Sequence, residues 1–116
     1  MPLFSQAAFL LPIITNMIGE GLISTQSSEV QEPQCVVVAP TRELATQIQL
    51  EARKFSHGTI LRTVVIYGGT SVGHQASQVK RGTHLLVATP GRLMDFIDKG
   101  IVSGGFLFGT SMTERI

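Results

Sequence analysis

The sequence contains a single cysteine, Cys35, which excludes an intramolecular disulfide framework and indicates a reducing compartment. Because Cys35 opens an apolar run, we interpret its thiol as buried and structural rather than nucleophilic. Cysteine and histidine nowhere share the spacing of zinc ligands, so no metal site is predicted. Residues 3–18 are apolar, but Pro12 interrupts them and no basic residue precedes them. They fit neither a membrane span of roughly 20 residues nor a secretory signal.

Acidic side chains are missing from the middle of the chain. No Asp or Glu occurs between Ala52 and Met94, yet six lysines and arginines and all three histidines fall there. The formal net charge of the whole chain is only +1, so the distribution is more informative than the total. It predicts a basic half-domain suited to an anionic partner such as a phosphate backbone. A solvated basic face with no partner is the alternative.

The apolar patterns predict an α/β protein of one domain at most. Apolar runs rich in β-branched residues predict strands at 35–39, 63–67 and 84–88, and their uniform apolarity is typical of a parallel sheet covered on both faces. A helix follows each strand, so the core is expected to be βαβαβα. An earlier helix is expected within residues 7–18, and Gly19–Pro33 is interpreted as a surface connection. The side chains expected to face inward are Ala7, Leu10, Leu11, Ile14, Ile18, Leu44, Ile48, Ala52, Phe55, Val72, Ala76, Val79, Leu93, Phe96 and Ile97.

Each strand ends in a turn that opens a helix. In a parallel sheet these turns lie at one edge, where first-turn N–H groups and the positive end of the helix dipole attract anions. Thr41 and Ser71 are predicted to cap their helices. Glycines permit close approach to the main chain, and arginines can bond phosphate oxygens in pairs. A single turn is weak support, because Thr41 and Thr89 are equally well explained as plain helix caps. The candidate site residues are Pro40, Thr41, Arg42, Gly68, Gly69, Thr89, Pro90, Gly91 and Arg92.

The three turns resemble motifs of the DEAD-box RNA helicases. Ala39-Pro40-Thr41-Arg42-Glu43-Leu44 is similar to motif Ia, Tyr67-Gly68-Gly69 to the GG motif, and Ala88-Thr89-Pro90-Gly91-Arg92-Leu93 to motif Ib. The segments 51–55 and 69–75 resemble the Vasa-like branch. The resemblance covers residues 7–100 and implies part of an N-terminal RecA-like domain, of the P-loop NTPase type. It implies that the candidate residues bind the phosphates of single-stranded RNA, and that an intact relative uses ATP and Mg²⁺ to unwind short duplexes. It also implies a cytoplasmic location, with germ granules or the nucleus as alternatives.

The departures from the family pattern concern ATP. Where the family has Gly-Lys-Thr before its first helix, this chain has Phe4-Ser5-Gln6, and no GxxxxGK[ST] occurs anywhere. The Asp-Glu-Ala-Asp strand expected after Gly100 is replaced by Gly104-Gly105-Phe106-Leu107-Phe108-Gly109. No catalytic or cofactor-binding residue is therefore predicted, and we expect this chain to bind neither ATP nor Mg²⁺.

Two functions remain open. The first is a truncated piece of an RNA-dependent ATPase, whose activity belongs to the longer parent and its remaining helicase core. The second is a non-catalytic RNA-binding or interfering fragment. A nucleotide-binding domain outside the helicases is a third reading, which no glycine-rich phosphate loop supports.

The resemblance also implies an incomplete sheet. The strands that carry the phosphate loop and the Asp-Glu-Ala-Asp motif are central in the family, so residues 1–100 are expected to form a partial domain with bare strand edges. Residues 101–116 are expected to be a poorly ordered tail. We therefore expect the isolated chain to aggregate or to unfold without cooperativity, which a sharp reversible thermal melt would contradict.

Overall fold

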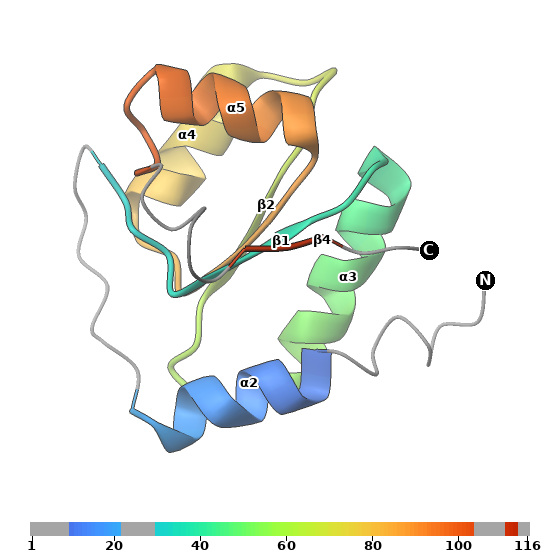
Figure 1. Ribbon diagram of the computed structural model, residues 1–116, viewed down its shortest axis with the longest axis vertical. Coiled ribbons are helices and arrows are strands. Elements are labelled where there is room, and N and C mark those ends of the chain that lie inside the picture. Colours follow the sequence, from blue (N-terminus) through green and yellow to red (C-terminus); the bar gives the residue numbers. More distant parts are fainter. Residues whose placement is uncertain (1–9, 22–29, 104–110, 114–116) are drawn as a thin grey trace.

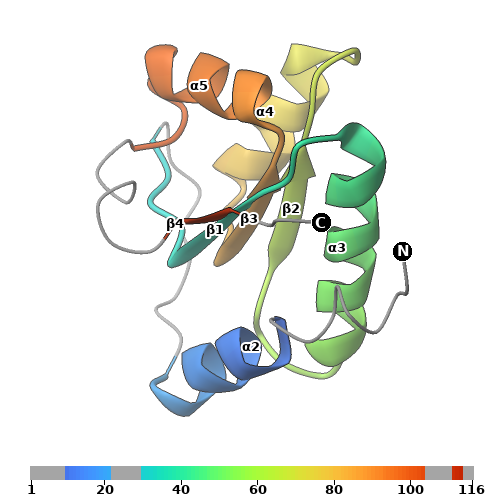
Figure 2. The ribbon, with the colours of Figure 1, turned by 45° about the vertical axis from the view of Figure 1, so that its right-hand side comes forward.

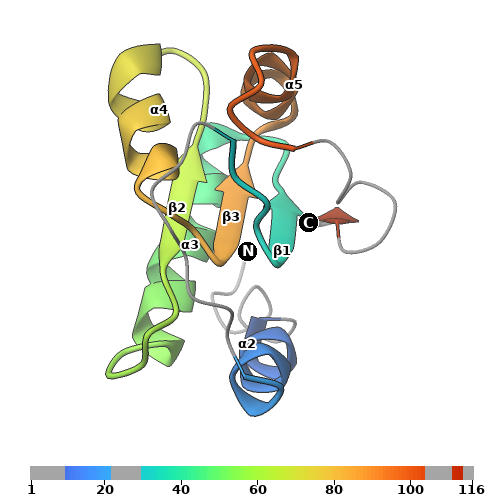
Figure 3. The same cartoon turned by 90° about the vertical axis from the view of Figure 1, so that its left-hand side faces the viewer.

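Parallel strands form one sheet in the order β2-β3-β1-β4 (Figure 3). The computed structural model describes residues 10–21, 30–103 and 111–113 of the chain. The helices are α2 (Leu10–Gly19), α3 (Arg42–Phe55), α4 (Val72–Lys80) and α5 (Pro90–Asp98); the strands are β1 (Cys35–Val38), β2 (Thr63–Ile66), β3 (Leu85–Ala88) and β4 (Ser111–Thr113). The predicted parallel α/β class is confirmed, and each predicted strand lies within a residue of its observed position.

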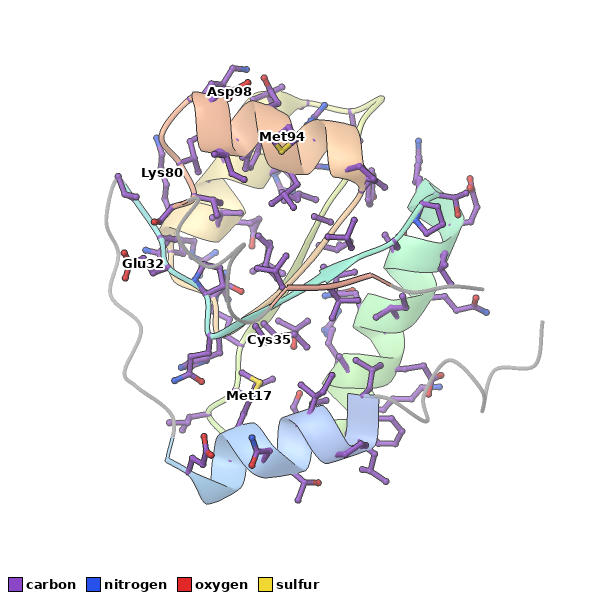
Figure 4. All side chains as sticks on the ribbon, in the orientation of Figure 1. Met17, Glu32, Cys35, Lys80, Met94 and Asp98 are labelled. Carbon is purple, nitrogen blue, oxygen red and sulfur yellow. The ribbon has the colours of Figure 1, made fainter. Side chains whose placement is uncertain are left out.

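The sheet lies between two helical layers (Figures 1 and 2). Alternate residues of a strand point to opposite faces, so Cys35 and Val37 pack with α2 and α3, while Val36 packs with α4 and α5. The side chains of β3 alternate between the same two faces, and all of its residues are buried. Figure 4 shows Met17 and Cys35 in the layer between α2 and the sheet. Burial on both faces explains why these strands are uniformly apolar.

Helix α2 differs from its prediction in the side that it buries. Leu10, Ile14 and Met17 are buried, whereas Leu11 is 51% exposed and Ile18 is 39% exposed. Met17 therefore replaces the two residues that we expected to face inward; the predicted Ala7 lies outside the described residues. Pro12 lies in the first turn of α2, where a missing N–H removes no helical hydrogen bond.

The remaining helices follow their predicted stripes with one exception. Thr41 Oγ1 accepts a hydrogen bond from Leu44 N at 3.1 Å, and Ser71 Oγ accepts one from His74 N at 3.3 Å, so both predicted caps are confirmed. Phe55 was expected to face inward but is 36% exposed, and it is the last residue of α3. Ala45, near the start of α3, is also buried.

Of the segment that we expected to be a poorly ordered tail, the structure describes residues 101–103 and 111–113; residues 104–110 and 114–116 lie outside the described residues, so the expectation stays a prediction. Ile101 and Val102 are buried against α5, and Gln31 N donates to the Ile101 carbonyl at 2.9 Å. β4 pairs with β1 in parallel register, with Val37 opposite Met112. Bare strand edges were expected: β1 is paired on both sides, whereas the outer edge of β2 pairs with no strand among the described residues. That the isolated chain aggregates or unfolds without cooperativity stays a prediction, which thermal unfolding would test.

Candidate nucleic-acid interface

The carboxyl ends of three strands lie in one row. Val38 is opposite Ala88, which is opposite Ile66 on the other side. The next residues continue the ladder, since Ala39 N donates to the Ala88 carbonyl at 2.9 Å and Thr89 N to the Ile66 carbonyl at 3.1 Å. The turns at 39–42, 67–70 and 89–92 consequently leave the sheet from the same edge. The structure brings the candidate residues together as the parallel topology predicts.

The turn after β2, residues 67–70, is contacted by Arg42 from the motif Ia segment. The Arg42 guanidinium carbon lies 5.0 Å from the centre of the Tyr67 ring, within range of a cation–π contact. Gly69 has φ of +84°, a conformation that side chains other than glycine rarely adopt. A Cβ placed at Gly69 would lie 3.9 Å from Arg42 Nη1, an ordinary contact distance. The backbone conformation therefore requires glycine at position 69, and the Arg42 side chain occupies the neighbouring space.

Arg92 contacts the same turn through α5, which covers the opposite face of the sheet from α3. Its Nη2 donates to the Thr70 carbonyl at 3.2 Å, and its Nη1 donates to Gln75 Oε1 at 3.0 Å. The guanidinium carbon lies 5.9 Å from the ring centre of Phe96, which is fully buried. Arg92 is therefore held in place by the protein before any ligand arrives. The guanidinium hydrogens that these two bonds leave unused are available to an anion.

Gln75 is the residue that our sequence reasoning missed. It is 5% exposed, and its Oε1 also accepts the Tyr67 N–H at 3.1 Å. One amide oxygen thus links α4, the turn after β2 and Arg92. The position could have been found, because Gln75 falls three residues after Val72 on the inward face of α4, where a polar side chain needs a partner.

The two threonines are not equivalent. Thr41 caps α3 through its side chain, as described above, whereas Thr89 makes no side-chain capping bond although it precedes α5. Pro90 is the first residue of α5 and has no N–H, which leaves the first-turn N–H groups of Gly91 and Arg92 without helical acceptors. Gly91 is exposed, and a Cβ added there would meet nothing within 4 Å. The start of α5 is open to a ligand on its main-chain side.

Residues 7–107 match the family description "DEAD/DEAH box helicase". The chain belongs to this helicase family. The match begins at the predicted residue and continues past Gly100, where we had expected the resemblance to end. The structure is similar to solved DEAD-box proteins. It matches the yeast splicing factor Prp28 with a TM-score of 0.74 and 31% identity over 84% of this chain and 23% of that one. The RNA helicase Prp28 from Chaetomium thermophilum, bound to ADP, matches with a TM-score of 0.64 and 39% identity, over 81% and 22%.

Individual helicases support the Vasa-like branch. The chain is 59% identical over 93 residues to the probable ATP-dependent RNA helicase DDX4 of Homo sapiens, and 48% identical over 94 residues to a probable vasa-like ATP-dependent RNA helicase of Penaeus vannamei. The predicted branch is confirmed. These alignments cover 80% and 81% of this chain but only 13% of either relative. The chain therefore spans about an eighth of the length of the relatives that it matches.

Membership of the family implies ATP and Mg²⁺ for the longer relatives, but the residues of this interface do not fit Mg²⁺-ATP. Mg²⁺ is bound through carboxylate and phosphate oxygens, and the turns at 39–42, 67–70 and 89–92 contain no Asp or Glu. Within the described ranges, no three His, Cys, Asp or Glu side chains gather as a metal site. Residues 4–6, at the expected phosphate-loop position, lie outside the described residues. Among the described residues, no helix has the length and hydrophobicity needed to cross a membrane.

Proposed function

We propose that this helicase-family chain binds the phosphate backbone of single-stranded RNA along the carboxyl edge of its sheet. The observation that carries the proposal is the placement of Arg42 and Arg92 on either side of one turn, residues 67–70. Two guanidinium groups beside one turn, with no carboxylate in the motif GG and Ib segments, suit consecutive phosphates better than one small anion.

We propose that the starts of α3 and α5 each bind one phosphate. Arg42 and the Thr41 hydroxyl bind one phosphate at the start of α3, where the helix dipole adds to the attraction. The Thr89 hydroxyl and the first-turn N–H groups of Gly91 and Arg92 bind the next at the start of α5. Pro40, Gly68, Gly69 and Pro90 shape these turns and leave the main chain accessible. Contacts of this kind position a strand without reading its sequence.

The proposal assigns no ATPase activity to this chain. ATP-driven unwinding, which the names of its relatives imply for them, needs residues for ATP that this sequence lacks. The chain would therefore act as a non-catalytic RNA-binding module, and the alternative is that activity resides in a longer parent. Phosphate release from ATP, measured with and without RNA, tests the absence of ATPase activity: turnover by the purified chain would contradict our proposal.

The direct test is fluorescence anisotropy of labelled oligouridylate at several salt concentrations. Each neutralised phosphate contributes about −0.7 to the slope of log affinity against log salt for a single strand, so two arginines predict a slope of about −1.4 or steeper. A labelled oligoadenylate of equal length should bind within about threefold, because backbone contacts do not read bases. Affinity that is independent of salt, or absent at low salt, would overturn the proposal.

A further inference from the structure

A groove of about 710 Å³ runs beside the outer edge of β2. α3 and the loop at residues 56–59 form one wall, and α4 forms the other. α3 and α4 lie on opposite faces of the sheet, so the groove occupies the position that a further strand would take. Arg42 and Arg92 do not line it.

The floor of the groove presents unpaired main-chain groups. The carbonyls of Arg62 and Ile66 face β3, because they accept the N–H groups of Leu85 at 3.2 Å and Thr89 at 3.1 Å. Hydrogen-bonding direction alternates along a parallel strand, so the N–H and C=O groups of Thr63 and Val65 face the groove. Buried Thr63 Oγ1 has no hydrogen-bond partner among the described residues. This edge therefore offers donors and acceptors in alternation.

The walls of the groove are basic. Arg53 and His57 lie on the α3 side and His74 on the α4 side, and no Asp or Glu lines the groove. Arg62 also lines it, and burial together with the charge of Arg81 lowers the pKa of Arg62. That direction is expected for a cation that lacks a nearby counter-charge. The site thus complements a negatively charged occupant.

We propose that this groove binds an extended acidic peptide, which adds a strand to the outer edge of β2. A peptide main chain matches alternating donors and acceptors, whereas an RNA backbone supplies phosphate acceptors but few donors, so the floor favours a peptide. Acidic side chains of the peptide would lie against Arg53, His57 and His74. A second copy of this chain is a poorer occupant, because its own β2 edge has the same basic walls. The groove borders the proposed RNA interface, because Tyr67, Thr70 and Gln75 line it, but neither Arg42 nor Arg92 does.

The test uses the full 116-residue chain and a labelled eight-residue peptide that alternates glutamate and valine. We expect saturable binding by anisotropy, together with slower hydrogen exchange at the amides of Thr63 and Val65. Arg53→Glu should weaken peptide binding at least about tenfold, since it reverses a charge at the groove wall. Lys54→Glu is the matched control: Lys54 neighbours Arg53, does not line the groove and has 70% exposure of its side chain. It should change affinity by less than about twofold.

Two further probes distinguish strand pairing in the groove from simple charge attraction and from binding at the RNA interface. A peptide of the same sequence with N-methylated amides keeps its charge but cannot pair with β2, and it should not bind. Arg42→Ala should leave peptide affinity unchanged.

Three results would overturn the proposal: equal binding of the N-methylated peptide, unchanged hydrogen exchange at the Thr63 and Val65 amides, or equal losses of peptide affinity in Arg53→Glu and Lys54→Glu. Displacement of the peptide by oligouridylate, with RNA affinity also lost in Arg53→Glu, would assign the groove to RNA instead. Concentration-dependent dimerisation that blocks the peptide would assign it to a second copy.

Discussion

Arg92 Nη1 donates to Gln75 Oε1 at 3.0 Å, and the same oxygen accepts the N–H of Tyr67. This pair joins α5 to the turn after β2 through a buried side chain. Gln75 is 5% exposed, so water reaches this region poorly. Without the Gln75 side chain, the Arg92 guanidinium and the Tyr67 N–H would each lose a hydrogen-bond acceptor that water could not readily replace. We therefore treat Gln75 as a positioning residue for the proposed RNA interface.

Replacement of Gln75 by alanine should lower both stability and RNA affinity. The unpaired Tyr67 N–H should cost about 1–3 kcal/mol in the free energy of unfolding by urea. Arg92 would lose one of its two anchors, and oligouridylate affinity should fall in parallel. Ser77→Ala, at an exposed position of the same helix, is the control and should change neither quantity appreciably. Loss of stability without any loss of RNA affinity would limit Gln75 to a structural role.

Replacement of Arg42 by alanine should affect RNA binding far more than stability. Its exposed cation–π contact with Tyr67 is worth about 0.5–1 kcal/mol. The salt slope of RNA binding should become shallower by about 0.7, since one phosphate contact is lost. Lys54→Ala removes an equal charge from the other end of α3 and should leave the slope unchanged. Equal slopes for the two variants would show that Arg42 contacts no phosphate.

Replacement of Gly91 by alanine should change stability and binding in opposite directions. Gly91 lies in the first turn of α5 with open space around it, so a methyl group should stabilise the helix by up to about 1 kcal/mol. The same methyl group would obstruct a phosphate at the main chain and weaken oligouridylate binding. Thermal unfolding and anisotropy on one sample measure both effects. Unchanged affinity would mean that the start of α5 does not contact RNA.

The two glycines after Tyr67 should differ in their tolerance of alanine. Gly69 has φ of +84°, and alanine in that conformation should cost about 1–2 kcal/mol. Gly68 has no such conformation and nothing within 4 Å of an added Cβ, so Gly68→Ala should cost much less. Urea unfolding of the two variants side by side checks this. Equal losses would show that the positive φ of Gly69 does not decide the choice of glycine there.

Stability should decline in alkaline solution through Cys35. Burial raises the pKa of this thiol to about 11, above its ordinary value near 9, because the thiolate is disfavoured in an apolar environment. The folded state therefore holds the thiol proton more tightly than the unfolded state. Its contribution is complete below about pH 9 and is lost as the pH rises toward 11. Cys35→Ala is the control, and its unfolding free energy should fall less steeply over this range.

The sequence alone determined the local features of the chain. Strands 35–38 and 85–88 are recognisable because residues buried on both faces must all be apolar. The cap at Thr41 and the helix start at Pro90 follow from chemistry within four residues. The parallel arrangement follows from helices between strands, and it places the candidate turns at one edge.

Only the tertiary structure decided which distant residues meet. Arg92 and Gln75 are brought together because β3 lies next to β2. β4 pairs with β1, whereas no strand among the described residues pairs with the outer edge of β2. Met17 rather than Ile18 is buried because it is on the side of the apolar helix α2 that packs in the cluster with α3 and the sheet. Local periodicity carries no information on strand order or helix orientation. These depend on the combined packing of segments far apart in the chain, and so do the fixed guanidinium of Arg92 and the groove beside β2.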